Sequence, residues 1–172
     1  GDHVAFCVRN LDLQMVRKGA VCGDPTHRPP PVAQEFVAQI VVLESEPEPI
    51  CVGFSAVLDC HTAHVACILT DILYGVDKAG QRLPDAPDSR AKVLPGESAI
   101  GAFSAMRPIC VEPATDFPAL GRFVMRSNRR TVLHGVVKAL GGCEAYLEGE
   151  GEGRPPLECA VDGGEEAPDA LS

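Results

Sequence analysis

No apolar stretch of this sequence approaches the roughly twenty residues that a membrane-spanning helix requires, so the sequence contains no candidate for one. The chain also does not open with the charged, apolar and small-residue segments of a secretory signal. Because it begins at Gly1, directly inside a strand-like run, we expect a fragment whose missing upstream part could carry such a signal.

Several catalytic and nucleotide-binding motifs are absent as well. The sequence has no G-x-S-x-G, no H-E-x-x-H, no paired-carboxylate pattern and no G-x-x-x-x-G-K-[ST] phosphate loop. We therefore expect these residues to hold no nucleotide, metal or other cofactor and to catalyse no reaction on their own. Taken alone, the residues indicate a binding module.

The 3.6-residue periodicity of amphipathic helices is absent over any long window, whereas the fifteen prolines and seventeen glycines are typical of short strands and turns. The sequence therefore predicts an all-β fold, a small closed barrel. Further short strands are expected between residues 1 and 23. The main candidate strands lie at 34–43, 54–77, 97–104, 108–111, 121–126 and 130–137.

The net charge of −9 is unevenly distributed along the chain. Residues 143–172 hold nine acids and one base, or −8, and the other 142 residues hold fifteen acids and fourteen bases, or −1. An almost neutral body does not exclude nucleic acid as a partner. Apolar residues become scarce from Gly141 onward, so we expect a disordered acidic tail at 142–172.

The eight cysteines form no Cys-x-x-Cys pair and no regular frame, which favours a reduced, cytoplasmic setting over a disulfide scaffold. Cys60, His61, His64 and Cys67 resemble zinc ligands in composition. On a strand, however, residues four apart are separated by about 13 Å, and neither Gly nor Pro is present to form a tight turn. Cys60 and His61 would point to opposite faces, so a nucleophile pair is also disfavoured. We expect all four residues to be structural.

Residues 120–140 have the pattern of two strands joined by a polar turn at Ser127–Arg130. Arg126, Arg129 and Arg130 give one end of this predicted hairpin a local positive charge. Guanidinium groups suit phosphate binding, but such arginines can equally be solvated or paired with nearby carboxylates. Another segment, 23–31, contains three consecutive prolines and predicts a domain boundary or a stiff crossing between domains.

Four segments together resemble the C-terminal part of eukaryotic translation elongation factor 1-alpha. They are GDPTHRPP at 23–30, LDCHTAHVAC at 58–67, RPICVEP at 107–113 and LGRFVMRSNRRTVLHGVVKAL at 120–140. The opening residues resemble the last strands of that family's middle barrel. The resemblance implies the end of a middle β-barrel at 1–28, a six-stranded antiparallel barrel at 29–141, and the tail beyond it.

The resemblance also implies a function. The family is a GTPase that delivers aminoacyl-tRNA to the ribosomal A site, with GTP and magnesium bound by a domain that would precede Gly1. The third barrel contacts the tRNA T-arm and packs on that GTPase domain. Aminoacyl-tRNA, the ribosome and the GTPase domain are thus expected partners, with the nucleotide exchange factor and actin as further ones. The expected RNA-binding residues are Arg126, Ser127, Asn128, Arg129, Arg130 and Thr131.

The sequence departs from the family pattern at several points. The segment 81–92 and the C-terminus are lysine-rich in the family but not in this chain, whose tail is acidic. His134 occupies a position that we expect to face the barrel interior, where a neutral histidine needs a partner. Alternative readings are a GTPase of termination or ribosome rescue, a non-ribosomal protein-interaction barrel, and a non-functional fragment.

Overall fold

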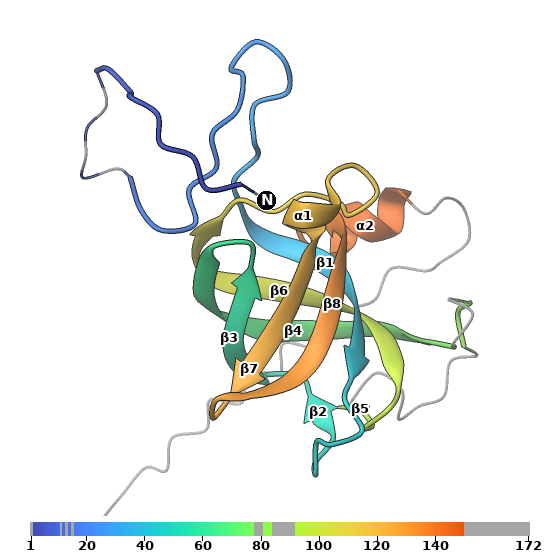
Figure 1. The fold of residues 1–172 in the computed structure, drawn as a ribbon. Coiled ribbons are helices and arrows are strands. Elements are labelled where there is room, and N and C mark those ends of the chain that lie inside the picture. Colours follow the sequence, from blue (N-terminus) through green and yellow to red (C-terminus); the bar gives the residue numbers. More distant parts are fainter. Residues whose placement is uncertain are drawn as a thin grey trace, which may run out of the picture.

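Six antiparallel strands form a closed barrel in the order β1-β6-β4-β3-β7-β8, which confirms the predicted six-stranded barrel (Figure 1). The computed structural model describes residues 2–10, 12, 14, 16–77, 81–83 and 92–149. A separate ribbon pairs β2 with β5. The elements are β1 (Ala33–Val42), β2 (Ile50–Cys51), β3 (Ser55–Cys60), β4 (Ala63–Val76), β5 (Lys92–Val93), β6 (Ser98–Ile109), α1 (Pro118–Gly121), β7 (Arg122–Ser127), β8 (Arg130–Leu140) and α2 (Cys143–Gly149).

Three phenylalanines form the centre of the barrel core. Phe36 stacks on Phe103 with ring centroids 5.6 Å apart, and Phe123 contacts both rings edge-on at 5.8 and 6.0 Å. Phe123 lies across Gly135 of the neighbouring strand, where an added Cβ would be 2.0 Å from the Phe123 ring. Alternate residues of the strands point inward, so one ring from each of β1, β6 and β7 fills the interior.

The described residues before Ala33 form no strand, and most of them are exposed. The prediction of short strands between residues 1 and 23 is therefore wrong. A strand requires a neighbour that pairs with its N–H and C=O groups, and this segment has none among the described residues. Its assignment to a middle barrel stays a prediction.

The run 54–77 is divided by a tight turn at His61–Thr62, because Cys60 pairs with Ala63 and Asp59 with His64. The expectation that no tight turn forms here is wrong. His61 adopts a φ of 43°, which side-chain-bearing residues rarely take, and its Nε2 lies 2.9 Å from the Cys110 carbonyl oxygen. This long-range hydrogen bond anchors the turn, and no local pattern in the sequence predicts the bond.

A β-bulge separates the two halves of the β7–β8 pairing. Met125 pairs with Leu133 but Arg126 pairs with Thr131, so Val132 has no partner opposite it. Val132 and Leu133 are both buried, and the alternation then resumes with His134 exposed. The prediction that His134 faces the interior is wrong, because the extra residue moves it to the outer face.

Helix α2 covers an apolar patch on the outside of the barrel. Cys143, Tyr146 and Leu147 pack against a buried cluster, and the hydroxyls of Tyr146 and Tyr74 lie 3.4 Å apart. The prediction of disorder is therefore wrong for residues 143–149, because Cys143, Tyr146 and Leu147 have an apolar surface to pack against. The predicted tail at 150–172 lies outside the described residues. The cluster consists of Val37, Leu73, Tyr74, Val76, Ile100 and Ala102.

Candidate nucleic-acid interface

The β7–β8 hairpin confirms the predicted pair of strands and ends in a two-residue turn. Ser127 pairs with Arg130, and the two turn residues Asn128 and Arg129 have φ values of 50° and 64°. Two successive positive φ angles characterise the type I′ turn, which matches the twist of the flanking strands. Asn adopts this conformation more readily than most residues. The turn that carries Arg129 joins β7 and β8 at one end of the barrel (Figure 1).

The arginines at this end differ in their surroundings. Arg129 and Arg130 are exposed, and within the described part of the chain neither side chain has an ion pair or a hydrogen bond. Asn128 is also exposed, whereas Ser127 and Thr131 are half-buried. The two arginines can therefore offer their N–H donors to an anion without first giving up a protein partner.

Arg126 already has a carboxylate partner. Its Nε lies 3.5 Å from Asp59 Oδ2, and the other Asp59 oxygen contacts His64 Nδ1. Asp59 and His64 face each other across the β3–β4 pair, and Arg126 lies on the adjacent β7. The sequence motif places Arg126 at the hairpin but does not reveal Asp59, because only the barrel pairing brings β3 beside β7. Asp59 thus lowers the positive potential near Arg126.

The four residues with metal-ligand character have separate partners. The Cys60 thiol donates to the Leu120 carbonyl at 3.4 Å, and the Cys67 thiol to the Val65 carbonyl at 3.7 Å. Burial, together with the nearby Cys110, raises the pKa of Cys60 to about 11, and burial raises the pKa of Cys67 to about 12. Both thiols stay protonated at neutral pH, whereas the thiolate is the nucleophile and the ligand. Among the described residues, no group of three or more His, Cys, Asp or Glu side chains is placed to hold a metal ion.

No helix in the described ranges is both long and apolar enough to cross a membrane. The six predicted RNA-binding residues are contiguous in space as in sequence, since they form the turn and the strand ends beside it. Their arrangement offers cationic and neutral hydrogen-bond donors on a rigid β-hairpin. Such a surface suits the phosphates and sugar hydroxyls of a nucleic acid backbone.

Comparison with known proteins identifies a family for most of the barrel. A model described as GTP-eEF1A C-terminal domain-like matches residues 35–138. Elongation factor 1-alpha of Absidia glauca is 44% identical over 141 residues, which are 81% of this chain and 30% of that protein. The protein of the same name from Eremothecium gossypii is 43% identical with the same coverage. The chain thus spans about 30% of the length of these relatives.

A solved structure is also similar to the chain. The structure of sup35 complexed with GDP superposes with a TM-score of 0.60 and is 29% identical in sequence. The similarity covers 67% of this chain and 28% of the sup35 chain. The elongation factors therefore match the chain with higher identity and over more of its length than sup35 does.

Proposed function

Because the chain belongs to the GTP-eEF1A C-terminal domain-like family, we propose that its β7–β8 turn binds the phosphate backbone of aminoacyl-tRNA. The whole protein would be a translational GTPase of the elongation factor 1-alpha type that delivers aminoacyl-tRNA to the ribosome in the cytoplasm. GTP and magnesium would be bound by a preceding domain, which packs on this barrel. The identities of 44% and 43% to elongation factor 1-alpha, against 29% to sup35, favour elongation over the alternative GTPase roles.

The observation that carries the proposal is the pair of unpartnered arginines at the hairpin end. A factor that serves many tRNAs needs contacts to the backbone and not to base edges, and arginine forks on phosphate supply affinity without sequence preference. At the turn end of the hairpin, Arg129 and Arg130 have no protein partner in the described residues, whereas Arg126 is paired with Asp59. Asn128 and Thr131 can add neutral hydrogen bonds to ribose hydroxyls.

The double substitution Arg129→Ala/Arg130→Ala is expected to weaken binding of aminoacyl-tRNA and to reduce its salt dependence. Each lost phosphate contact lowers the slope of log affinity against log salt by about 0.7–0.9, so the double variant should lose about 1.4–1.8. Filter binding over a series of salt concentrations measures both quantities. Arg126→Ala should have a smaller effect, because Asp59 already partly neutralises Arg126.

The matched control is Arg9→Ala/Arg17→Ala, which removes the same charge from exposed positions before the barrel. This variant should retain the slope of the unmodified protein. An unchanged affinity and slope for the Arg129/Arg130 variant, or an equal loss in the control, would refute an RNA site at the turn.

A further inference from the structure

A second site lies beside α1, where the segment before the barrel contacts the barrel through Arg28. Glu112, three residues after the end of β6, is only 3% exposed, and it is the one buried charged residue in the described part of the chain. Its Oε2 forms an ion pair with Arg28 Nη2, and the two atoms are 3.2 Å apart. Burying an ionised carboxylate is costly unless a cation or several donors compensate it. Arg28 therefore compensates the negative charge of the buried Glu112 carboxylate.

Two further groups surround the same guanidinium. Arg28 Nη2 donates a hydrogen bond to Asp116 Oδ2, and Arg28 Cζ lies 5.0 Å from the centre of the Phe117 ring. The hydrogen bond from Arg28, followed by that from Thr115, holds the pKa of Asp116 below its ordinary value, so this carboxylate is ionised at neutral pH. Two carboxylates and an aromatic face form the surroundings that favour a planar cation over a compact ammonium.

The barrel holds this site in place through the backbone. The Glu112 N–H donates to the Leu120 carbonyl at 3.2 Å, and the Ala114 N–H donates to the Val137 carbonyl at 3.1 Å. These bonds tie the loop 112–117 to α1 and to β8. The three groups that contact the guanidinium thus lie on a loop that is hydrogen-bonded to α1 and to β8, which favours a pre-formed site.

The segment that delivers Arg28 is itself folded tightly. The Asp24 carboxylate accepts hydrogen bonds from the Thr26 N–H at 2.8 Å and from the Thr26 hydroxyl at 2.6 Å. A Cβ added to Gly23 would lie 2.4 Å from the Pro30 ring, so the two ends of this loop are in contact. Arg28 has a φ of 54°. The loop therefore presents the arginine in a conformation that its side-chain contacts must help to maintain.

We propose that Glu112, Asp116 and Phe117 form an arginine-binding site, which Arg28 occupies in cis and which fastens residues 23–32 to the end of the barrel. The ligand class is a guanidinium group. Arg28 lies at the point where the chain enters the barrel, so the occupied site fixes the direction of the preceding segment. An ordinary surface ion pair would contribute almost nothing to stability, whereas loss of Arg28 leaves the buried Glu112 without its cation.

The experiment compares Arg28→Ala, Arg28→Lys and the control Arg17→Ala, which removes an exposed arginine of the same segment. The melting temperature and the rate of proteolytic cleavage within residues 16–32 are measured, each with and without millimolar methylguanidinium or methylammonium. We expect Arg28→Ala to melt several degrees lower and to be cleaved several times faster, with Arg28→Lys in between and Arg17→Ala unchanged. Methylguanidinium should restore part of the melting temperature of Arg28→Ala, and methylammonium should not.

The double variant Arg28→Ala/Glu112→Gln keeps the proposal testable in a second way. It should melt higher than Arg28→Ala, because the unpaired buried charge is gone, and it should lose the response to methylguanidinium. The proposal is overturned if Arg28→Ala behaves like Arg17→Ala, or if the two small cations act alike on Arg28→Ala. If Arg28→Ala does not fold, the same comparison is made with Arg28→Lys. Methylguanidinium should again raise the melting temperature more than methylammonium does.

Discussion

Replacing Phe103 with alanine is expected to lower the free energy of unfolding by about 3–5 kcal/mol. Phe103 is 1% exposed and contacts both other rings of the core, Phe36 and Phe123. The barrel is closed by hydrogen bonds between all neighbouring strands, so it cannot collapse easily to fill the space that the ring leaves. This loss is a large fraction of the roughly 5–15 kcal/mol that stabilises a typical domain.

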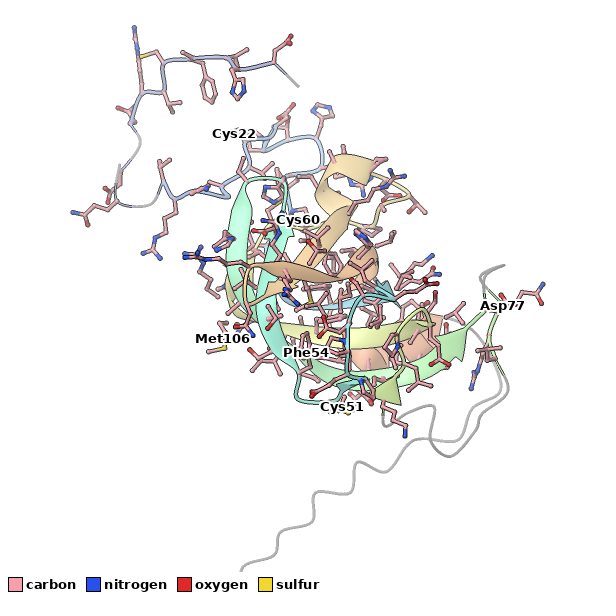
Figure 2. The ribbon with its side chains drawn as sticks, turned by 60° about the horizontal axis from the view of Figure 1, so that its bottom comes forward. Cys22, Cys51, Phe54, Cys60, Asp77 and Met106 are labelled. Carbon is pink, nitrogen blue, oxygen red and sulfur yellow. The ribbon has the colours of Figure 1, made fainter. Side chains whose placement is uncertain are left out.

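Urea denaturation followed by circular dichroism measures this loss as a shift of the midpoint. Met106→Ala is the control, because Met106 lies on the same strand, β6, with 67% of its surface exposed (Figure 2). Its midpoint should remain close to that of the unmodified protein. Equal midpoints for the Phe103 and Met106 variants would show that the three rings are not the centre of the core.

The substitution Gly121→Ala is expected to destabilise the barrel by about 3 kcal/mol, the upper part of the range for overpacking. A Cβ at this position would lie 2.5 Å from the backbone N and Cα of Ala114 and 2.6 Å from the Glu112 carbonyl oxygen. Backbone atoms cannot rotate away as a side chain can. The loop 112–117 would have to shift, although alanine is the better helix former in isolation.

Gly142→Ala is the matched control for this substitution. Its Cβ would meet only Glu35 Oε2 at 3.1 Å, the end of a flexible side chain. Both changes restrict the unfolded chain equally, so the difference between the two variants reports the clash in the folded state. A Gly121→Ala protein that is as stable as Gly142→Ala would mean that the loop accommodates the methyl group.

The barrel and its C-terminal hairpin could be predicted from the sequence because their signals are local. Alternating apolar residues followed by a polar turn predict a hairpin wherever they occur, and β7 and β8 follow that pattern. The same pattern in the first 23 residues led to a wrong prediction of strands. Alternating apolar residues show that a segment is able to form a strand, but not that a neighbouring strand exists to pair with it. The predicted orientation of His134 is wrong for a related reason. One unpaired residue, Val132, changes the face of the sheet to which every following side chain points.

The contacts that define the two sites could not be predicted from local pattern. Asp59 reaches Arg126 only because closure of the barrel places β3 beside β7. Arg28 is followed by three prolines, so the sequence indicates only a polar linker at this position. In the structure Arg28 compensates the carboxylate of Glu112, which follows β6. The sequence pattern places the arginines at the turn, but their role in RNA binding was predicted from the resemblance to elongation factor 1-alpha and stays a prediction.

The placement of β7 between α1 and the hairpin turn makes the two sites independent of each other. The six residues Arg122–Ser127 separate the guanidinium site from the turn, and the two lie at opposite ends of the barrel (Figure 1). At roughly 3.3 Å per residue the strand spans about 17 Å, about twice the Debye length of about 8 Å at physiological salt. A charge removed at one end is therefore largely screened at the other. Substitutions at the proposed RNA site and at the proposed arginine-binding site should therefore have additive effects.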